Sequence, residues 1–152
     1  MAKRILLVLL ITFISPAFAD GTLRVGLSAD YPPLHFKQDG KIIGLEVDNA
    51  TAVAKILGKK LVLFEYSFHE LVLAVEQGRI DAIMSGISVT EARAETISFT
   101  DPYMEIGQMA ILHMDKIGSF AQPGAIYRDK VRVGVEPGTT GASFAKQKLP
   151  DA

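Results

Sequence analysis

Apolar residues in the first half of the chain follow two different periods. Residues 23–27 alternate and are rich in β-forming side chains, which predicts a strand, and the turn signal Asp39-Gly40 predicts a small hairpin. Residues 45–57 repeat with a helical period, whereas residues 61–64 form a continuous apolar run, as in a parallel strand covered on both faces. The pattern therefore predicts a strand, a hairpin, a helix and a second strand.

The same alternation continues with a further helix and strand. Ser67 and Glu70 have the spacing of a capping box, which predicts the start of a second helix. Residues 80–84 form a third short apolar run, and Thr90 has the position of a cap for a short helix, residues 91–95. Strands that alternate with helices form a parallel sheet with right-handed crossovers, so the predicted fold class is α/β.

A second region follows, with a less regular pattern. Residues 109–114 and 131–135 are predicted as strands. Residues 116–128 contain two glycines and a proline and are predicted as a loop. Residues 138–141, Gly-Thr-Thr-Gly, are predicted to open one more helix.

The N-terminus has the three parts of an export signal. Two basic residues precede residues 5–14, which are apolar except for one threonine, and residues 17–19 read Ala-Phe-Ala, the A-x-A form of a cleavage site. An apolar run of this length is too short to cross about 30 Å of hydrocarbon at about 1.5 Å per residue. We therefore expect residues 1–19 to be a cleaved signal peptide and the mature protein to be secreted.

Composition and charge exclude several classes of partner. The chain has 16 basic and 17 acidic residues and no basic run, which argues against nucleic acid as a partner. It has no cysteine, which excludes a disulfide framework, thiol chemistry and the lipid-anchored cysteine of a lipoprotein. We therefore expect a freely diffusing monomer in the bacterial periplasm.

Hydroxyls, aromatic rings and a cation follow the predicted strands. They are Ser28 and Tyr31 after the first strand, Phe68 after the second, and Ser85, Ser88 and Arg93 after the third. The carboxyl ends of parallel strands meet at one edge of a sheet, where ligands bind. Free amides at a helix start and a guanidinium that binds two oxygens at once suit a small carboxylate. The sequence thus predicts a pocket for an amino-acid-like ligand.

Each candidate alone also has a simpler structural explanation. Arg93 could pair with a glutamate of its own helix, and Phe68 could anchor the start of a helix on the core. Residues 138–141 lack the lysine of a phosphate loop and the spacing of a dinucleotide fingerprint. Thr139 and Thr140 are therefore compatible both with a carboxylate site and with a plain capped helix. The functional interpretation rests on the prediction that all these candidates lie at the same edge of the sheet.

No metal or other cofactor is expected. His35, His69 and His113 fall in different elements without the spacing of metal ligands, and no cysteine is available to complete a site. The chain also lacks a Gly-x-Ser-x-Gly elbow, so nothing in the sequence supports hydrolysis by a nucleophilic serine.

Five sequence blocks of the chain resemble the motifs of a known protein family. They are LRVGLSADYPPL from residue 23, IGLEVD from residue 43, GRIDAIMSGISVTEARA from residue 78, FTDPY from residue 99 and VGVEPGTTG from residue 133. Together they resemble family 3 of the bacterial extracellular solute-binding proteins, the periplasmic receptors of polar amino-acid and opine ABC importers. The resemblance runs from about residue 23 to the end of the chain.

The resemblance implies a periplasmic-binding-protein type II clamshell, in which two α/β lobes close on a ligand and deliver it to an ABC-transporter permease in the inner membrane. It divides the chain into residues 20–104 as lobe 1 and residues 105–152 as an incomplete lobe 2. Family members continue further and return to lobe 1. We therefore expect a fragment or a truncated product, with poor stability and weak binding.

The resemblance also implies a role for each candidate residue. The implied ligand side-chain walls are Tyr31 and Phe68, the implied carboxylate ligands are Ser88, Arg93 and Thr140 with Thr139 beside them, and the implied amino-group ligands are Ser85 and the carbonyl of Gly86. Many binders of cationic ligands have an aspartate where this chain has Ser28, which argues against lysine, arginine or histidine as the preferred ligand.

Other functions use the same fold. Periplasmic cyclohexadienyl dehydratases, which act on prephenate or arogenate, resemble this family and share the Met-Ser-Gly-Ile-Ser segment that begins here at Met84. Such a reaction needs a general acid, and no carboxylate in the predicted loops is clearly devoted to that role. Sensor and lytic-transglycosylase accessory domains are further alternatives. We expect a transport receptor rather than an enzyme.

Overall fold

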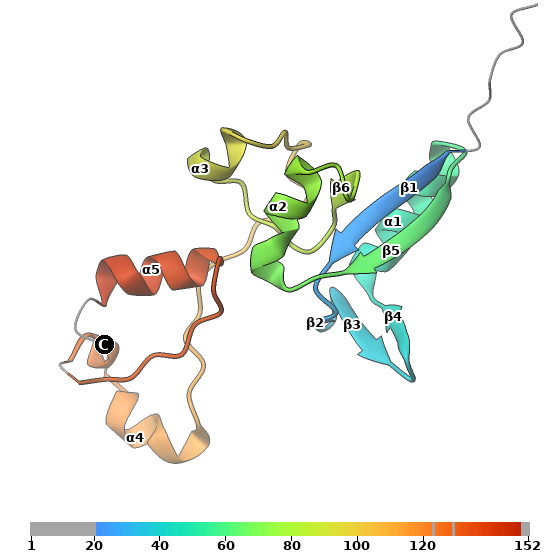
Figure 1. Ribbon diagram of the computed structural model, residues 1–152. Coiled ribbons are helices and arrows are strands. Elements are labelled where there is room, and N and C mark those ends of the chain that lie inside the picture. Colours follow the sequence, from blue (N-terminus) through green and yellow to red (C-terminus); the bar gives the residue numbers. More distant parts are fainter. Residues whose placement is uncertain (1–20, 123, 129, 150–152) are drawn as a thin grey trace, which may run out of the picture.

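Three parallel strands form the central sheet of the protein. The computed structural model describes residues 21–122, 124–128 and 130–149, so the expected signal peptide lies outside the described residues. The strand order is β5-β1-β6, and the strands are β1 (Thr22–Leu27), β5 (Lys60–Glu65) and β6 (Ala82–Ile83) (Figure 1). Val25 in the central strand pairs with Leu63 on one side and Ala82 on the other. The predicted parallel α/β sheet is confirmed, although its third strand is shorter than residues 80–84.

One helix covers each face of the sheet. Leu23 and Val25 of β1 pack against α1 (Leu45–Ile56) through Ala50 and Ala54. The short helix η1 (Phe68–Glu70) leads directly into α2 (Leu71–Glu76), which forms a second core cluster with Ile80. Gly26 faces this second layer, where a Cβ would lie 2.4 Å from the Ile80 side chain. A larger residue at this position would force the Ile80 side chain to shift, so glycine favours the close approach of this layer to the central strand.

A small antiparallel sheet leads from β1 to α1. It consists of β2 (Asp30–Tyr31), β3 (His35–Gln38) and β4 (Lys41–Ile43). The turn residues Asp39 and Gly40 have φ values of 50° and 75°, as a two-residue hairpin turn requires. The predicted hairpin is confirmed.

The prediction that residues 61–64 are covered on both faces was wrong. β5 lies at the edge of the sheet and is not covered on both faces, so Phe64 remains 36% exposed. The buried face of α1 is made by Glu46, Ala50 and Ala54, whereas Val53 is 39% exposed. Small side chains and one buried carboxylate, rather than the largest apolar residues, therefore form the contact of α1 with the sheet.

The second region is connected to the sheet by an extended segment, residues 104–112, and its described residues form helices and no strand (Figure 1). Its elements, after α3 (Glu91–Ala94), are η2 (Met114–Lys116), α4 (Ile117–Phe120), η3 (Ala125–Tyr127) and α5 (Thr140–Lys148). The strands predicted for residues 109–114 and 131–135 are wrong, because a strand needs a hydrogen-bonded neighbour and neither segment has one among the described residues. The predicted loop at residues 116–128 contains two short helices instead.

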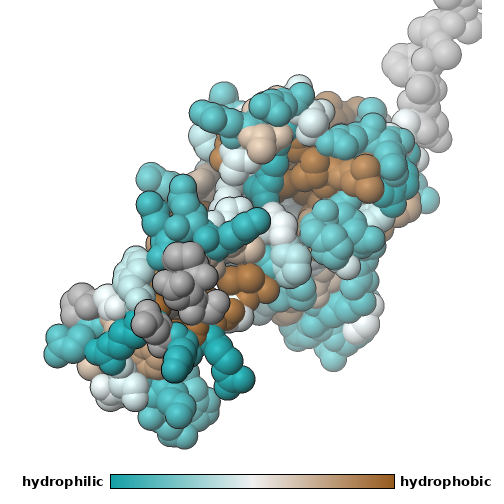
Figure 2. All heavy atoms as spheres, turned by 60° about the vertical axis from the view of Figure 1, so that its left-hand side comes forward, coloured by the Kyte–Doolittle hydropathy of each residue, from teal (hydrophilic) through white to brown (hydrophobic). Residues whose placement is uncertain are grey.

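The surface of the molecule is mixed in polarity. Apolar patches interrupt a mostly hydrophilic surface in Figure 2. Several exposed apolar side chains belong to the extended segment, where Met109 is 89% and Ile111 is 98% exposed. Within residues 21–122, 124–128 and 130–149, none of the helices is both long and apolar enough to cross a bilayer.

Candidate functional site

The candidate residues that follow the three strands lie at one edge of the central sheet. Ser28 directly follows β1, Phe68 follows β5 after a short turn, and Ser85 follows β6. Because the three strands are parallel neighbours, their carboxyl ends meet at this edge. The predicted capping box is also present, with the Glu70 carboxylate accepting a hydrogen bond from the Ser67 N–H at 3.2 Å.

Ser28 and Ser85 are buried and hydrogen-bonded to each other. Their exposures are 4% and 2%. The Ser28 N–H donates to the Ser85 hydroxyl at 3.0 Å, and the two hydroxyl oxygens are 3.3 Å apart. The buried His35 contacts both residues through its two ring nitrogens. Sequence reasoning treated His35 as an isolated histidine, because its partners are seven and fifty residues away in the chain.

Tyr31 and Gly86 lie next to each other. Tyr31 is 51% exposed and its ring lies edge-on to His35, with centroids 5.8 Å apart. Gly86 has a φ of 59°, and a Cβ there would lie 3.3 Å from Leu34 and 3.8 Å from the Tyr31 ring. The left-handed backbone and the close ring both favour glycine at this position.

Arg93 is directed inward and not toward open solvent. Thr90 caps α3 by accepting a hydrogen bond from the Arg93 N–H at 3.3 Å, as predicted. The guanidinium lies over the Phe68 ring with its carbon 5.7 Å from the centroid, and it donates to the carbonyls of Ser88 at 2.6 Å and Gly138 at 2.8 Å. Burial lowers the pKa of Arg93 from its ordinary value. The charge is therefore held between the loop after β6 and the start of α5.

The start of α5 packs against η1. Gly138 lies so close to His69 that a Cβ would be 2.8 Å from the histidine Cβ. Thr139 caps α5 by accepting from the Ala142 N–H at 3.0 Å. The Thr140 hydroxyl accepts a hydrogen bond from the Gln108 side chain at 2.8 Å. Thr139 and Thr140 are therefore already engaged in capping and packing.

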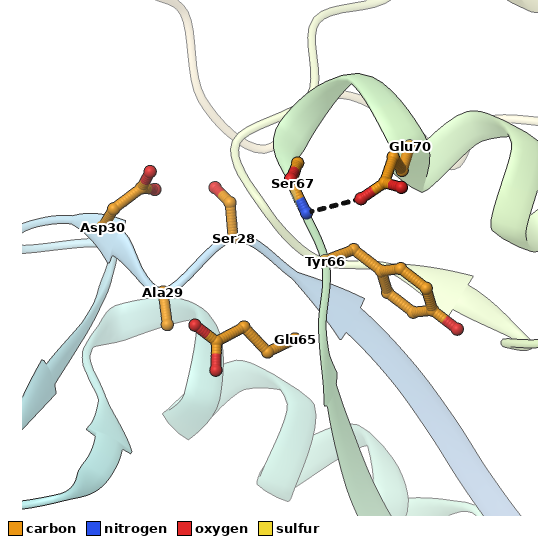
Figure 3. Close-up of a pocket in the computed structure, with 7 residues that line it drawn as sticks. All are labelled: Ser28, Ala29, Asp30, Glu65, Tyr66, Ser67 and Glu70. Atoms are coloured by element: carbon orange, nitrogen blue, oxygen red, sulfur yellow. Dashed lines mark hydrogen bonds between the residues drawn. The ribbon is translucent and has the colours of Figure 1, made fainter.

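Two cavities border these residues. The smaller one, of about 380 Å³, lies between the loop after β1 and the loop after β5, and Ser28 reaches it (Figure 3). The larger one, of about 1030 Å³, is lined mainly by apolar side chains and includes Glu46, Gly86 and Ser88. Of the nine predicted residues, Ser28 lines the smaller cavity and Gly86 and Ser88 line the larger one, whereas the other six line neither of these two cavities.

Glu46 is a buried carboxylate that sequence reasoning did not select. It is fully buried, and its Oε1 accepts hydrogen bonds from the Gly86 N–H at 3.2 Å and the Tyr103 hydroxyl at 2.5 Å. Its Oε2 has no hydrogen-bond partner within the described part of the chain. A glutamate in the first turn of a helix is usually a surface residue near the positive end of the dipole. Its spacing with Ala50 and Ala54 was the available signal for burial.

A parallel α/β sheet whose strand-end loops gather hydroxyls, aromatic rings and an arginine defines a ligand-binding domain. The chain belongs to the bacterial extracellular solute-binding proteins, family 3, which match residues 23–145. A crystal structure of the ancestral amino acid-binding protein AncCDT-1, a precursor of cyclohexadienyl dehydratase, is similar with a TM-score of 0.82 and 37% identity, over 87% of this chain and 59% of that one. The predicted family and the type II fold are confirmed for the part covered.

Curated relatives include both receptors and an enzyme. ABC transporter arginine-binding protein 1 of Escherichia coli is 30% identical over 99% of this chain and 60% of its own length. Cyclohexadienyl dehydratase of Pseudomonas aeruginosa is 33% identical over 87% of this chain and 50% of its own length. The arginine-bound form of domain 1 from TmArgBP is 42% identical, with a TM-score of 0.53, over 55% of this chain and 67% of that one. The chain therefore spans about half to three fifths of the curated relatives' length.

Proposed function

We propose that this chain is the ligand-binding part of a periplasmic receptor that captures an amino acid for an ABC-transporter permease. The observation that carries the proposal is the position of Arg93. Its half-buried guanidinium lies over the Phe68 ring and reaches the start of α5 through Gly138. A cation held between two parts of a chain and close to a helix start is suited to an anionic group. The signal at residues 1–19 supports export to the periplasm.

The ligand carboxylate would bind at Arg93. A guanidinium has five N–H donors, and Ser88 and Gly138 each accept one of them. The contact with the Gly138 carbonyl joins the two parts of the chain, and a bound carboxylate would compete for that donor. The Thr140 hydroxyl accepts a hydrogen bond from Gln108 and could donate its own proton to the carboxylate, whereas the Thr139 hydroxyl already donates to the Glu136 carbonyl. Tyr31 and Phe68 would flank the ligand side chain, and the carbonyl of Gly86 would receive its amino group, because the buried Ser85 hydroxyl is already hydrogen-bonded to Ser28 and His35.

The printed names of the relatives support an amino acid as the ligand. They include receptors for arginine, histidine and cystine. One of the similar structures is the arginine-bound form of domain 1 from TmArgBP. Delivery to a permease is the role shared by the transport relatives.

A thermal-shift screen of the full chain against the twenty common amino acids tests the proposal. A ligand that binds only the native state raises the melting temperature, and isothermal titration then gives the affinity. Arg93→Ala should weaken binding by roughly tenfold or more, because a charged hydrogen bond is worth about 1.5–3 kcal/mol.

Arg79→Ala is the matched control, because Arg79 lies over the Tyr66 ring with its carbon 5.1 Å from the centroid and away from α5. This variant should leave the affinity unchanged. Melting temperatures that no amino acid raises would refute the proposal. Equal losses of affinity in the two arginine variants would show that Arg93 does not bind the ligand directly.

A dehydratase remains the second candidate, and Glu46 is the observation that favours it. The reaction needs a general acid, and Glu46 is a buried carboxyl at the larger cavity with one oxygen lacking a partner among the described residues. Incubation of the protein with prephenate, followed by phenylpyruvate absorbance, distinguishes the two functions. Product formation that is lost in Glu46→Gln would establish the enzyme, whereas absence of product together with amino-acid binding would establish the receptor.

A further inference from the structure

A closed ring of hydrogen bonds lies behind the smaller pocket. His35 Nδ1 is 2.5 Å from the carbonyl oxygen of Ser28, and its Nε2 is 3.2 Å from the Ser85 hydroxyl. The Ser85 hydroxyl is in turn 3.3 Å from the Ser28 hydroxyl. All three residues are at least nine-tenths buried. The ring therefore has no easy alternative partner in solvent.

Elementary chemistry decides the direction of each proton in this ring. A carbonyl oxygen can only accept, so Nδ1 of the neutral His35 ring carries the proton. Nε2 is then a bare acceptor, and the single O–H of Ser85 must donate to it. With that proton used, Ser85 can only accept from its second neighbour, so the Ser28 hydroxyl donates to Ser85.

The result is a Ser28 oxygen that offers only lone pairs to the pocket. Figure 3 shows this hydroxyl oxygen at the end of β1, directed into the space between Asp30 and Ser67. The pocket of about 380 Å³ is also lined by the carboxylates of Asp30, Glu65 and Glu70. Its side-chain oxygens thus favour a hydrogen-bond donor and disfavour another acceptor.

Two of the three carboxylates have other contacts. Glu65 forms an ion pair with Lys37 at 2.7 Å, and Glu70 accepts from the Ser67 N–H at 3.2 Å. Each still borders the pocket, and Asp30 adds a third negative charge. One nearby lysine does not balance three acidic groups, so the local field favours a cation.

We propose that His35 is a positioning residue that orients the Ser85 and Ser28 hydroxyls, so that the pocket beside Ser28 accepts the cationic side chain of a basic amino acid. The inference rests on the proposed function and names the ligand class for the same site. It differs from the expectation drawn from the sequence, in which Ser28 in place of an aspartate argued against a basic ligand. The ring supplies an oriented acceptor where the carboxylate is missing.

The direction of the hydrogen bonds in this ring can be measured without any ligand. Nitrogen NMR of the full chain with ¹⁵N-labelled histidine at pH 8 distinguishes the two neutral tautomers from each other and from the doubly protonated ring. The signals are assigned with His35→Leu, His69→Leu and His113→Leu. A protonated Nδ1 and a bare Nε2 for His35 support the proposal, and the opposite tautomer overturns it.

Ligand preference gives the second test. L-Arginine and L-citrulline have nearly the same shape, but only arginine carries a positive side chain. The wild-type chain should bind arginine roughly tenfold or more tightly than citrulline, as expected for a charged hydrogen bond. Equal affinities would overturn the proposal. Failure of the wild type to bind any amino acid would instead refute the proposed receptor function. The tautomer measurement would still establish the direction of the hydrogen bonds in the ring.

Variants then separate positioning from folding. His35→Leu should reduce the ratio of arginine to citrulline affinity several-fold, and His113→Leu, which changes an exposed histidine, should not. Ser85→Ala interrupts the ring with a smaller change in side-chain volume. It therefore replaces His35→Leu in the same measurement of the affinity ratio if His35→Leu does not fold. In a Ser85→Ala background His35→Leu should have no further effect on the ratio, because the residue acts through that hydroxyl. A ratio unchanged in folded His35→Leu or Ser85→Ala would overturn the proposal.

Discussion

Glu46 and Tyr103 show how one buried charge depends on a distant residue. The carboxylate lies in the first turn of α1, and its Oε1 accepts hydrogen bonds from the Gly86 N–H and the Tyr103 hydroxyl. Tyr103 is 60% exposed, yet its hydroxyl reaches the buried oxygen. Loss of a donor to a buried acceptor lowers the free energy of unfolding, so this contact stabilises the packing of the chain at Tyr103 against α1.

Tyr103→Phe should therefore lower the free energy of unfolding by about 1–2 kcal/mol. Urea unfolding followed by circular dichroism measures the change. Tyr127→Phe, at a tyrosine that is 56% exposed, is the matched control and should change little. Equal stabilities for the two variants would show that the Tyr103 hydroxyl does not support Glu46.

The same tyrosine predicts a dependence on pH. Burial, and then the neighbouring Glu46 carboxylate, raise the pKa of Tyr103 above its ordinary value of about 10. Because the unfolded chain releases this proton first, the wild type should lose stability as the pH rises above about 10. Tyr103→Phe lacks that loss, so the difference in unfolding free energy between the two proteins should shrink from pH 9 to pH 10.5. A constant difference would contradict the assignment.

At the scale of elements, the start of α5 is the joint between the two regions. Gly138 has a φ of 78° and packs directly on His69 of η1. Its carbonyl accepts a hydrogen bond from Arg93. One backbone position therefore carries both the close approach of the helix and the contact with the candidate site.

Gly138→Ala should loosen this joint. The new Cβ would lie in a left-handed conformation and within 3.0 Å of the His69 backbone, which costs about 1–2 kcal/mol. Amide hydrogen exchange in residues 140–148 should become roughly tenfold faster, while exchange in β1 and β5 stays the same. Gly134→Ala, at a glycine with open space around it, is the control. Unchanged exchange in α5 would refute the proposed joint.

At the scale of the whole molecule, the buried apolar side chains and the ladder hydrogen bonds are distributed unevenly along the chain. The sheet and the two helices that cover it hold most of the buried apolar side chains. The extended segment from residue 104 to residue 112 has no strand partner in the part of the chain that the structure describes and exposes several large apolar residues. The division into lobes at residues 104 and 105 stays a prediction.

Hydrogen exchange of the full chain should follow this distribution. Amides of β1, which has a parallel neighbour on each side, should exchange slowest and only through global unfolding. Amides of residues 104–112 should exchange at least roughly a hundredfold faster, because they lack ladder hydrogen bonds. Mass spectrometry of peptic peptides measures both. Protection of residues 104–112 equal to that of β1 would mean that this segment has a strand partner.

Local patterns were sufficient for the first half of the fold. Alternation at residues 23–27, the helical period at residues 45–57 and the Asp39-Gly40 turn each predicted the element found. The helix and the turn succeeded because their geometry depends on local backbone preferences, and the strand succeeded because β5 and β6, farther along the chain, supply its hydrogen-bonded neighbours. The strands predicted at residues 109–114 and 131–135 failed, because β-propensity becomes a strand only where a neighbour is available to accept and donate hydrogen bonds.

The sequence by itself determined the α/β class, the family and the residue types at the carboxyl edge of the sheet. Only the tertiary structure decided which of those side chains face a cavity and which are already engaged. It placed Arg93 over Phe68, buried Ser28 and Ser85 with His35, and brought Glu46 to Tyr103. The physical reason is distance along the chain, because hydrogen-bond partners up to fifty-seven residues apart have no local signal in the sequence.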